Sequence, residues 1–173
     1  GALTMRGFTP DVTDIGKRHP VTSRLPGGPE SSANGQPQWG RWFRQIEIAE
    51  PAGETLMRGL DNQPLLVLNR AEEGRVAQML SDQIWLWARG FEGGGPQREL
   101  LRRLAHWLMK EPDLEENDLR ASLQDGALVI ERRSLEDRAF IAAVTDPDGV
   151  EKSVALTLGE DGIHRGALPV TRA

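Results

Sequence analysis

Two apolar runs separated by a very short loop place the strongest constraint on the fold of this chain. The runs cover residues 64–70 and 75–81, and they flank the tetrapeptide "AEEG". Two β-rich runs around a short loop with a glycine are typical of a β-hairpin, and we expect Gly74 to take the positive φ of the turn. Because both runs are almost continuously apolar, we predict that the hairpin lies inside a sheet covered on both faces.

A helix is predicted after this hairpin, over residues 96–110. Pro96 suits the first helical position, where its missing N–H costs nothing, and Pro112 ends the segment. Apolar residues between them recur at spacings of three and four, which places them on one face of a helix: Leu100, Leu101, Leu104, Trp107 and Leu108. We expect this helix to cover a face of the sheet.

The remaining segments suggest two domains joined by an acidic linker. Residues 25–38 are rich in Gly, Pro and Ser and predict an exposed loop, whereas the alternation within 39–50 predicts a strand. We place the first domain at 1–112 and the linker at 113–119. Four short strand candidates, with the turn sequences "DPDG" and "GEDG" between them, predict a small β-sandwich over 120–173. We expect this sandwich to be truncated and the chain to be a piece of a longer protein.

Composition excludes several kinds of chemistry. The net charge of −5 argues against a dominant nucleic-acid surface, so we predict no nucleic-acid partner. The absence of cysteine excludes disulfides, thiolate metal sites and a cysteine nucleophile within these residues. The three histidines, His19, His106 and His164, stand in separate segments without metal-ligand spacing, and we predict neither a metal nor a cofactor. The longest apolar runs are too short to cross a bilayer.

The stretch "SDQIWLWARGFEGGGPQ", residues 81–97, carries the residues best able to form a site. In an extended segment Trp85 and Trp87 share a face, and they either rim a binding cleft or pack under the helix against Trp107. Asp82 could contribute to such a cleft or cap a local turn. The candidate ligand cleft consists of Ser81, Asp82, Trp85, Trp87, Arg89 and Glu92, with His19 reaching its edge from a loop or serving as a structural histidine.

The glycines before the helix form a weaker candidate. Bare N–H groups at a helix N-terminus can hold an anion, which makes Gly94 and Gly95 a candidate anion-binding site. However, Pro96 removes one donor, Glu92 would repel phosphate, and no Lys-Ser/Thr pair follows as in a phosphate-binding loop. A flexible entry to the helix is the favoured interpretation of these glycines.

Longer strings in the chain resemble a known family. The segments "GKRHPVTSRL", "PLLVLNRAEEGRVAQMLSDQIWLWARGFEGGGPQRELLRRLAHWLMKEP" and "HWLMKEPDLEENDLRA" are similar to the class I glutamine amidotransferase-like domain of large bacterial membrane-anchored proteins of unknown function. The resemblance covers about residues 15–125. It implies an α/β fold, in which the C-terminal half of a flavodoxin-like parallel sheet with flanking helices precedes an immunoglobulin-like β region.

The same resemblance implies a cellular setting. In that family the domain follows membrane helices, so any membrane contact is expected only through segments absent from this chain. We accordingly expect the bacterial cell envelope, with this domain on the periplasmic side.

Catalysis is not expected even within that family. Glutaminases of this class use a Cys–His–Glu triad, whose His and Glu lie at the end of the strand before the last helix. Ser81, Asp82 and Gln83 occupy that place here, and none of them supplies the imidazole that would take a thiol proton. We therefore favour a non-catalytic interaction or scaffold module of a membrane-anchored protein over an enzyme.

Two other hypotheses stay open. One is a ligand-binding or hydrolase-like domain that acts on a carbohydrate or an amide through a Ser81/Asp82/Arg89 cleft. The other is a segment that only completes a fold whose active part lies upstream. For the module, the expected partners are unidentified proteins or other parts of the same full-length chain. A truncated sheet would also expose an edge strand, through which a homodimer can form.

Overall fold

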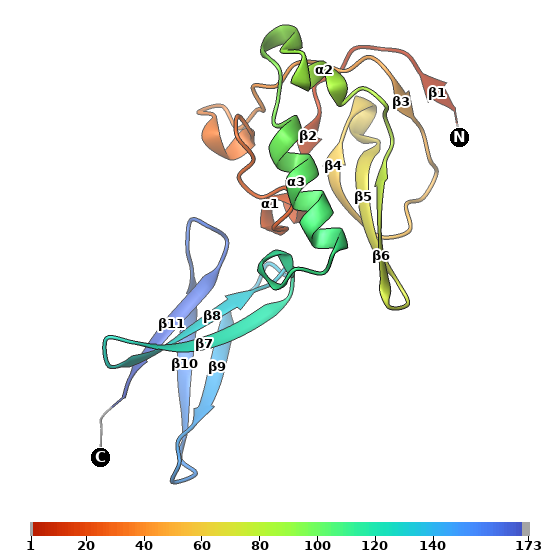
Figure 1. Cartoon of the computed structure of the whole chain (residues 1–173). Helices are drawn as coiled ribbons and strands as arrows, with labels where there is room; N and C mark the ends of the chain where they lie inside the picture. Colours follow the sequence, from red (N-terminus) through yellow and green to blue (C-terminus); the bar gives the residue numbers. More distant parts are fainter. Residues whose placement is uncertain (1, 171–173) are drawn as a thin grey trace. The chain divides into compact units, whose positions relative to one another are not determined.

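The computed structural model describes residues 2–170 and divides into two compact units. The first unit ends at Leu114, and the second begins at Glu115. Figure 1 shows the course of the chain through its strands and helices. Every pair of neighbouring strands in both units is antiparallel.

The first unit contains two sheets. The larger has four strands in the order β2-β4-β5-β6, namely β2 (Asp11–Val12), β4 (Glu54–Arg58), β5 (Pro64–Ala71) and β6 (Gly74–Met79). The smaller pairs β1 (Leu3–Thr4) with β3 (Gln45–Ile46). The strand predicted over 39–50 is thus reduced to two residues of regular pairing, preceded by an isolated bridge between Trp42 and Phe8.

The predicted hairpin is present as β5 and β6, which pair down to Ala71 and Gly74. Its turn consists of Glu72 and Glu73, and the positive φ belongs to Glu72 instead of Gly74. Residues 65–68 of β5 are all buried, so this strand is covered on both faces. β6 is the edge strand and alternates between half-buried and exposed residues, so the prediction of two covered faces is wrong for β6.

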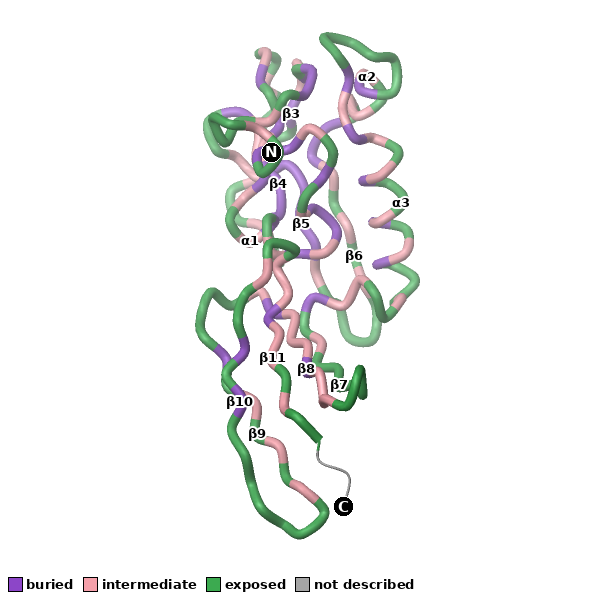
Figure 2. The backbone as a smooth tube through the Cα atoms, turned by 90° about the vertical axis from the view of Figure 1, so that its left-hand side faces the viewer, coloured by how far each residue is buried: buried purple, intermediate pink, exposed green. Residues whose placement is uncertain are grey.

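Helix α3 (Gln97–Leu108) packs against β6, and Figure 2 shows the two elements side by side. It begins directly after Pro96 and buries Leu100, Leu104 and Trp107. Leu101 and Leu108 are each 41% exposed, so the buried stripe is narrower than the sequence predicts. The shorter helical segments of the described chain are α1 (Asp14–Arg18), η1 (Pro29–Ser31), η2 (Leu60–Asn62), α2 (Trp85–Ala88), η3 (Phe91–Gly93) and η4 (Pro112–Leu114).

The core of the first unit is rich in tryptophan. Figure 2 shows buried residues along β4 and β5 and on one side of α3. The aliphatic residues of these strands form one cluster with four indole rings, those of Trp39, Trp42, Trp87 and Trp107. Large aromatic side chains bury the most apolar area per residue, so each of these rings contributes strongly to the hydrophobic stabilisation of the unit. Leu25 also joins this cluster, so the segment 25–38 is anchored at its start and is not a freely exposed loop.

The second unit is one five-stranded sheet in the order β7-β8-β11-β10-β9. Its strands are β7 (Asp118–Gln124), β8 (Ala127–Arg133), β9 (Phe140–Thr145), β10 (Glu151–Leu158) and β11 (His164–Pro169). β10 pairs with β9 over residues 151–156 and with β11 over residues 157–158. β10 thus pairs with its two neighbours over different parts of its length, and the sheet is a half-barrel.

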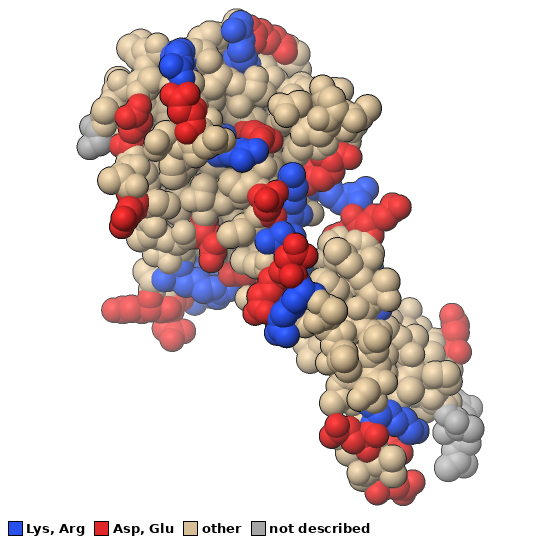
Figure 3. Space-filling model, turned by 180° about the vertical axis from the view of Figure 1, so that it is seen from behind, with Lys and Arg blue, Asp and Glu red and all other residues tan. Residues whose placement is uncertain are grey.

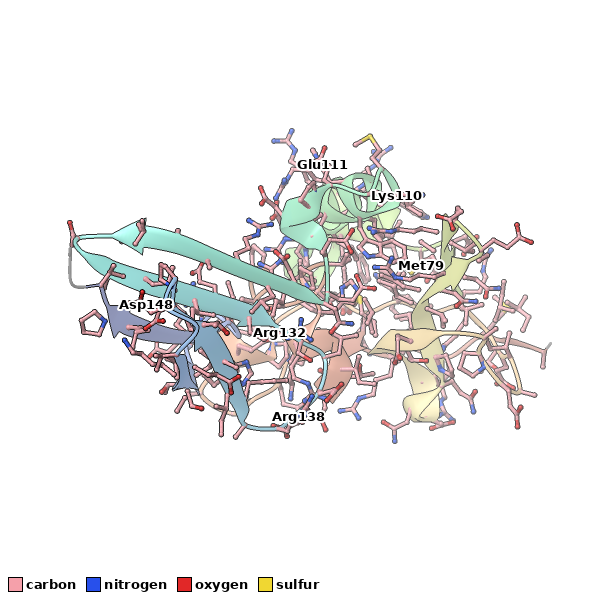
Figure 4. The ribbon with its side chains drawn as sticks, turned by 90° about the horizontal axis from the view of Figure 1, so that it is seen from below. Met79, Lys110, Glu111, Arg132, Arg138 and Asp148 are labelled. Atoms are coloured by element: carbon pink, nitrogen blue, oxygen red, sulfur yellow. The ribbon has the colours of Figure 1, made fainter. Side chains whose placement is uncertain are left out.

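The concave face of this half-barrel holds a small core of Ile130, Phe140, Val154 and Leu156. The Phe140 ring meets the His164 ring edge-on, with 4.9 Å between the ring centroids. The guanidinium groups of Arg132 and Arg138 lie 5.6 and 4.6 Å from the centroid of the same ring, and Figure 4 labels both arginines. Cations over a ring face are attracted by its quadrupole, so the two arginines help to cover this core.

The expected α/β fold is wrong. A parallel sheet needs crossover connections of a dozen or more residues, usually helical. Here β5 and β6 are joined by two residues, and α3 follows the last strand of its sheet instead of connecting two parallel strands. The second unit is a single curved sheet, so the expected two-sheet, immunoglobulin-like sandwich is also incorrect. β7 is a strand that the sequence analysis missed, and its first two residues lie in the segment assigned to the linker.

An ion-pair network ties α3 to the loop that follows α1. The Glu99 carboxylate accepts hydrogen bonds from Arg103 Nε at 2.7 Å and from Arg102 at 2.8 Å. Arg103 in turn donates to the backbone carbonyl of Ser23 at 2.6 Å. These hydrogen bonds from Arg102 and Arg103 lower the pKa of Glu99 from 4.5 to about 2.

We expect Glu99→Gln to lower the free energy of unfolding of the first unit by about 1 kcal/mol at pH 7. Because folding lowers the pKa of Glu99, its contribution is complete above pH 4.5 and is lost as the pH falls through about 2. The difference between wild type and variant should therefore narrow between these two pH values. Denaturant unfolding followed by tryptophan fluorescence measures the first unit alone, because all five tryptophans precede Leu114.

Glu73→Gln is the matched control, since Glu73 is an exposed carboxylate in the β5–β6 turn. It should unfold like the wild type at each pH. A Glu99→Gln deficit that stays constant down to pH 2 would contradict a stabilising role for the ionised carboxylate.

Candidate functional site

The segment after β6 turns into the short helix α2, which sends its two tryptophans in different directions. Residues two apart on a helix lie about 200° apart around its axis. Trp87 is accordingly buried, with 3% of its surface exposed, whereas Trp85 is 53% exposed. The prediction that Trp85 and Trp87 share a face is wrong, because it assumed an extended backbone.

Trp87 is the anchor of this segment. Its ring centroid lies 5.1 Å from that of Trp39 and 4.8 Å from that of Trp42, and its Nε1 donates to the Gly40 carbonyl at 2.8 Å. Gly95 passes directly beneath the ring, where a Cβ atom would come within 2.3 Å of Trp87. The buried ring therefore fixes both the start of α2 and the chain that leads into α3.

A second row of contacts joins residues 40–43 to η3. The Gly40 N–H donates to the Gly94 carbonyl at 2.8 Å, and the rings of Phe43 and Phe91 meet edge-on at 5.7 Å. The Glu92 carboxylate pairs with Arg41 at 2.6 Å. Hydrogen bonds from Arg41 hold the pKa of Glu92 below its ordinary value, so this carboxylate stays ionised and is a poor proton donor.

Ser81 and Asp82 lie in a different group of contacts. The Ser81 hydroxyl donates to the Arg44 carbonyl at 2.6 Å and accepts from the Gln83 N–H at 3.2 Å. The Asp82 carboxylate pairs with Arg44 at 2.8 Å. A shallow pocket is lined by Leu3, Arg44, Gln45, Ile46, Ser81 and Asp82.

The residues of the predicted cleft are divided among separate groups of contacts. Trp85, Arg89 and Glu92 do not line the pocket that contains Ser81 and Asp82. The side chain that accepts from the local turn is Ser81 and not Asp82, the residue predicted to cap it. Asp82 instead forms a surface ion pair with Arg44, 38 positions earlier in the chain. Arg89 is exposed, and within the described residues it takes part in none of the ion pairs of this region.

His19 lies away from these residues. It is 2% exposed, accepts the Val21 N–H on its Nδ1 atom at 3.1 Å, and meets the Trp107 ring edge-on at 6.0 Å. Burial among these partners fits a structural histidine and places its ring away from solvent.

The candidate anion site is occupied by the chain itself. The Gly94 N–H donates to the Phe91 carbonyl at 2.8 Å, and Gly95 is covered by the Trp87 ring. Two of the donors that a bound anion would need are thus committed or shielded, and Glu92 lies in the preceding turn.

Two aromatic side chains of this region are also exposed. Trp85 is 53% exposed and Phe91 is 39% exposed, and both belong to the short segment 85–91 that Trp87 anchors. Figure 3 shows arginines and carboxylates intermixed on the visible face of the molecule, without a single large basic or acidic area. Arg41, Phe43 and Arg44 were not among the predicted site residues, although the sequence "WGRWFR" holds three aromatic and two basic residues within six positions.

Comparisons with protein-family models, with curated proteins and with solved structures found no match for this chain. Across residues 2–170, no group of three or more His, Cys, Asp or Glu side chains is arranged to hold a metal ion. None of the helices in that range is both long enough and apolar enough to span a membrane.

We predict that Gly95→Ala destabilises the first unit by about 2–3 kcal/mol, because the added methyl group collides with the Trp87 ring. Gly90→Ala is the control. Gly90 has a positive φ of 74° but open space around its Cα atom, so that variant should lose only about 1 kcal/mol from backbone strain. Denaturant unfolding followed by tryptophan fluorescence gives both values. Equal losses would show that Trp87 does not press on this glycine.

We also predict that iodide quenches the emission of Trp85 far more than that of the other four tryptophans, which are at most 5% exposed. Trp85→Phe should remove most of the quenchable emission. Phe91→Leu, which changes the other exposed ring of segment 85–91, should leave that emission in place. Strong quenching that persists in Trp85→Phe would contradict the orientation of α2.

Proposed function

We propose that this chain is a non-catalytic interaction module and that it contacts a protein partner through the exposed aromatic residues of segment 85–91. The observation that carries the proposal is the exposure of Trp85 on a helix that the buried Trp87 holds in place. Tryptophan is enriched at the centres of protein interfaces, where a rigid ring buries a large area at little entropic cost. An exposed tryptophan on a fixed segment therefore favours a contact role over a packing role.

The polar residues of the same region support a non-catalytic role. A serine nucleophile needs a base within hydrogen-bond reach, but the Ser81 hydroxyl donates to a backbone carbonyl. The two nearby carboxylates, Asp82 and Glu92, are paired with Arg44 and Arg41. These contacts with the backbone and with arginines fit a structural role for the three side chains.

The cellular setting is part of the proposal. The resemblance of residues 15–125 to domains of membrane-anchored bacterial proteins supports a place in the cell envelope, on the periplasmic side. The resemblance also implied an amidotransferase-like parallel sheet, and the antiparallel fold gives no support to that implication. The proposed partners are another protein or another part of the same full-length chain.

A carbohydrate ligand is the second candidate function. The exposed Trp85 ring favours it, because sugars stack on aromatic faces at binding sites. We place this ligand on segment 85–91, because Arg89 does not line the pocket that contains Ser81 and Asp82. In that case soluble oligosaccharides should shift the Trp85 emission and protect it from iodide.

A photo-crosslinking amino acid at position 85 tests the proposal in cells that naturally make the protein. We expect one reproducible protein adduct, and the same adduct from position 91, because both side chains belong to one contact surface. Position 98 is the control, since Arg98 is exposed on α3 outside this segment. Absence of an adduct at 85, or an identical set of adducts from 98, would refute the proposed contact surface.

A further inference from the structure

β7 leaves one long edge of the second unit without a partner strand in the described chain. It stands at the end of the strand order, and only β8 pairs with it. Figure 4 shows β7 beside β8, with β7 on the outer side. An unpaired edge presents a row of backbone N–H and C=O groups that another strand can use.

The turn between β7 and β8 determines which residues offer those groups. Asp125 and Gly126 form a two-residue turn in which both have positive φ, and it is closed by Gln124 and Ala127. In such a hairpin the closing pair exchanges both of its hydrogen bonds, and alternate residues then do the same. The residues between them direct their N–H and C=O groups to the free edge, and these are Leu119, Ala121 and Leu123.

The side chains of the same three residues lie on the core face of the sheet. Ala121 stands opposite Ile130, a core residue, and Leu123 stands opposite Leu128, which packs against that core. Leu119 is nevertheless 63% exposed and Leu123 is 71% exposed. The apolar core therefore ends at β7 in exposed leucine side chains. The same strand directs backbone N–H and C=O groups to an edge that has no partner strand in the described chain.

We propose that β7 pairs in antiparallel fashion with β7 of a second copy of this chain, about a two-fold axis at Ala121. In this register Leu119 lies opposite Leu123 of the second copy, and Ala121 lies opposite the same alanine. Each of the three residues then exchanges its free backbone hydrogen bonds with the second copy. The leucines of both copies also extend the apolar margin into one continuous strip.

The charges of β7 agree with this register. Arg120 comes opposite Ser122 of the second copy, and Asp118 comes opposite Gln124, so no like charges meet across the interface. Arg120 is also paired with Asp118 of its own strand. The sequence of β7 is thus complementary to itself, and a two-fold pair closes without leaving a further β7 edge to propagate.

The other edge strand, β9, lacks this combination. Its core-facing residues, Phe140, Ala142 and Val144, are already buried or half-buried within a single copy of the chain. The Asp146 N–H donates to the Val150 carbonyl, so Ala143 falls in the alternating set that directs its backbone groups outward. Its side chain is exposed on the face opposite the core, which makes Ala143 a matched position for a control substitution.

The test is the oligomeric state of the whole chain, measured by sedimentation as a function of concentration. We expect a dimer that dissociates on dilution, because one strand pair buries less than a standard interface. Ala121→Pro should raise the dissociation constant at least about tenfold, since it removes an outward N–H while leaving the β7–β8 pairing intact. Ala143→Pro removes the equivalent group on β9 and should leave the dimer unchanged.

A pair of charge substitutions tests the register independently of proline. Leu119→Lys alone should weaken the dimer, because it places an ammonium group opposite a leucine of the second copy. The double variant Leu119→Lys, Leu123→Glu places opposite charges across the two-fold axis and should restore much of the affinity. Circular dichroism of each variant confirms that the sheet is retained.

A wild-type chain that stays monomeric at every concentration would overturn the proposal and leave the β7 edge to a strand of a different protein. A dimer that survives Ala121→Pro but is lost in Ala143→Pro would overturn it in favour of the β9 edge. Retention of dimerisation in all variants would place the interface elsewhere, for example on segment 85–91.

Discussion

The position of one indole ring, that of Trp87, determines how the first unit presents its surface. The ring lies against Trp39 and Trp42 and donates to the Gly40 carbonyl, so it joins segments that are 47 positions apart in the chain. Because Trp87 holds these two segments together, the Gly40–Gly94 hydrogen bond and the Arg41–Glu92 ion pair can form between them. Because α2 is one turn long, burying Trp87 leaves Trp85 in solvent, and the proposed contact surface is a direct consequence of the anchor.

Local patterns predicted the elements that depend on local forces. The β5–β6 hairpin and α3 were both predicted from apolar spacing within about 20 residues, and both are present. The direction of the sheets was not predictable in this way, because the pairing of β4 with β5 depends on residues that periodicity does not connect. β7 was missed since five of its seven residues are polar or charged or small, although the Asp125–Gly126 pair that follows it is a strong hairpin signal.

The candidate site shows the same division between local and long-range information. The sequence identified the stretch that carries Trp85 and Phe91, but it assigned both tryptophans to one face because helical periodicity cannot be recognised in four residues. It grouped Ser81, Asp82 and Glu92 by their proximity in sequence, whereas their arginine and carbonyl partners lie in the segment 41–44. Contacts between residues 37 to 51 positions apart in the sequence are determined by packing of the core. The local patterns of a single sequence do not reveal them.

The strand order of the second unit also bears on how it is synthesised. β11 comes last of the five strands, yet it lies between β8 and β10. As the chain leaves the ribosome, the β7–β8 and β9–β10 hairpins can form early, but the strand that joins them arrives only at the end. Until β11 inserts, β8 and β10 each have one unpaired edge and the apolar faces of both hairpins are uncovered. This interval is therefore the period in which the unit is most susceptible to misassembly and to binding by a chaperone.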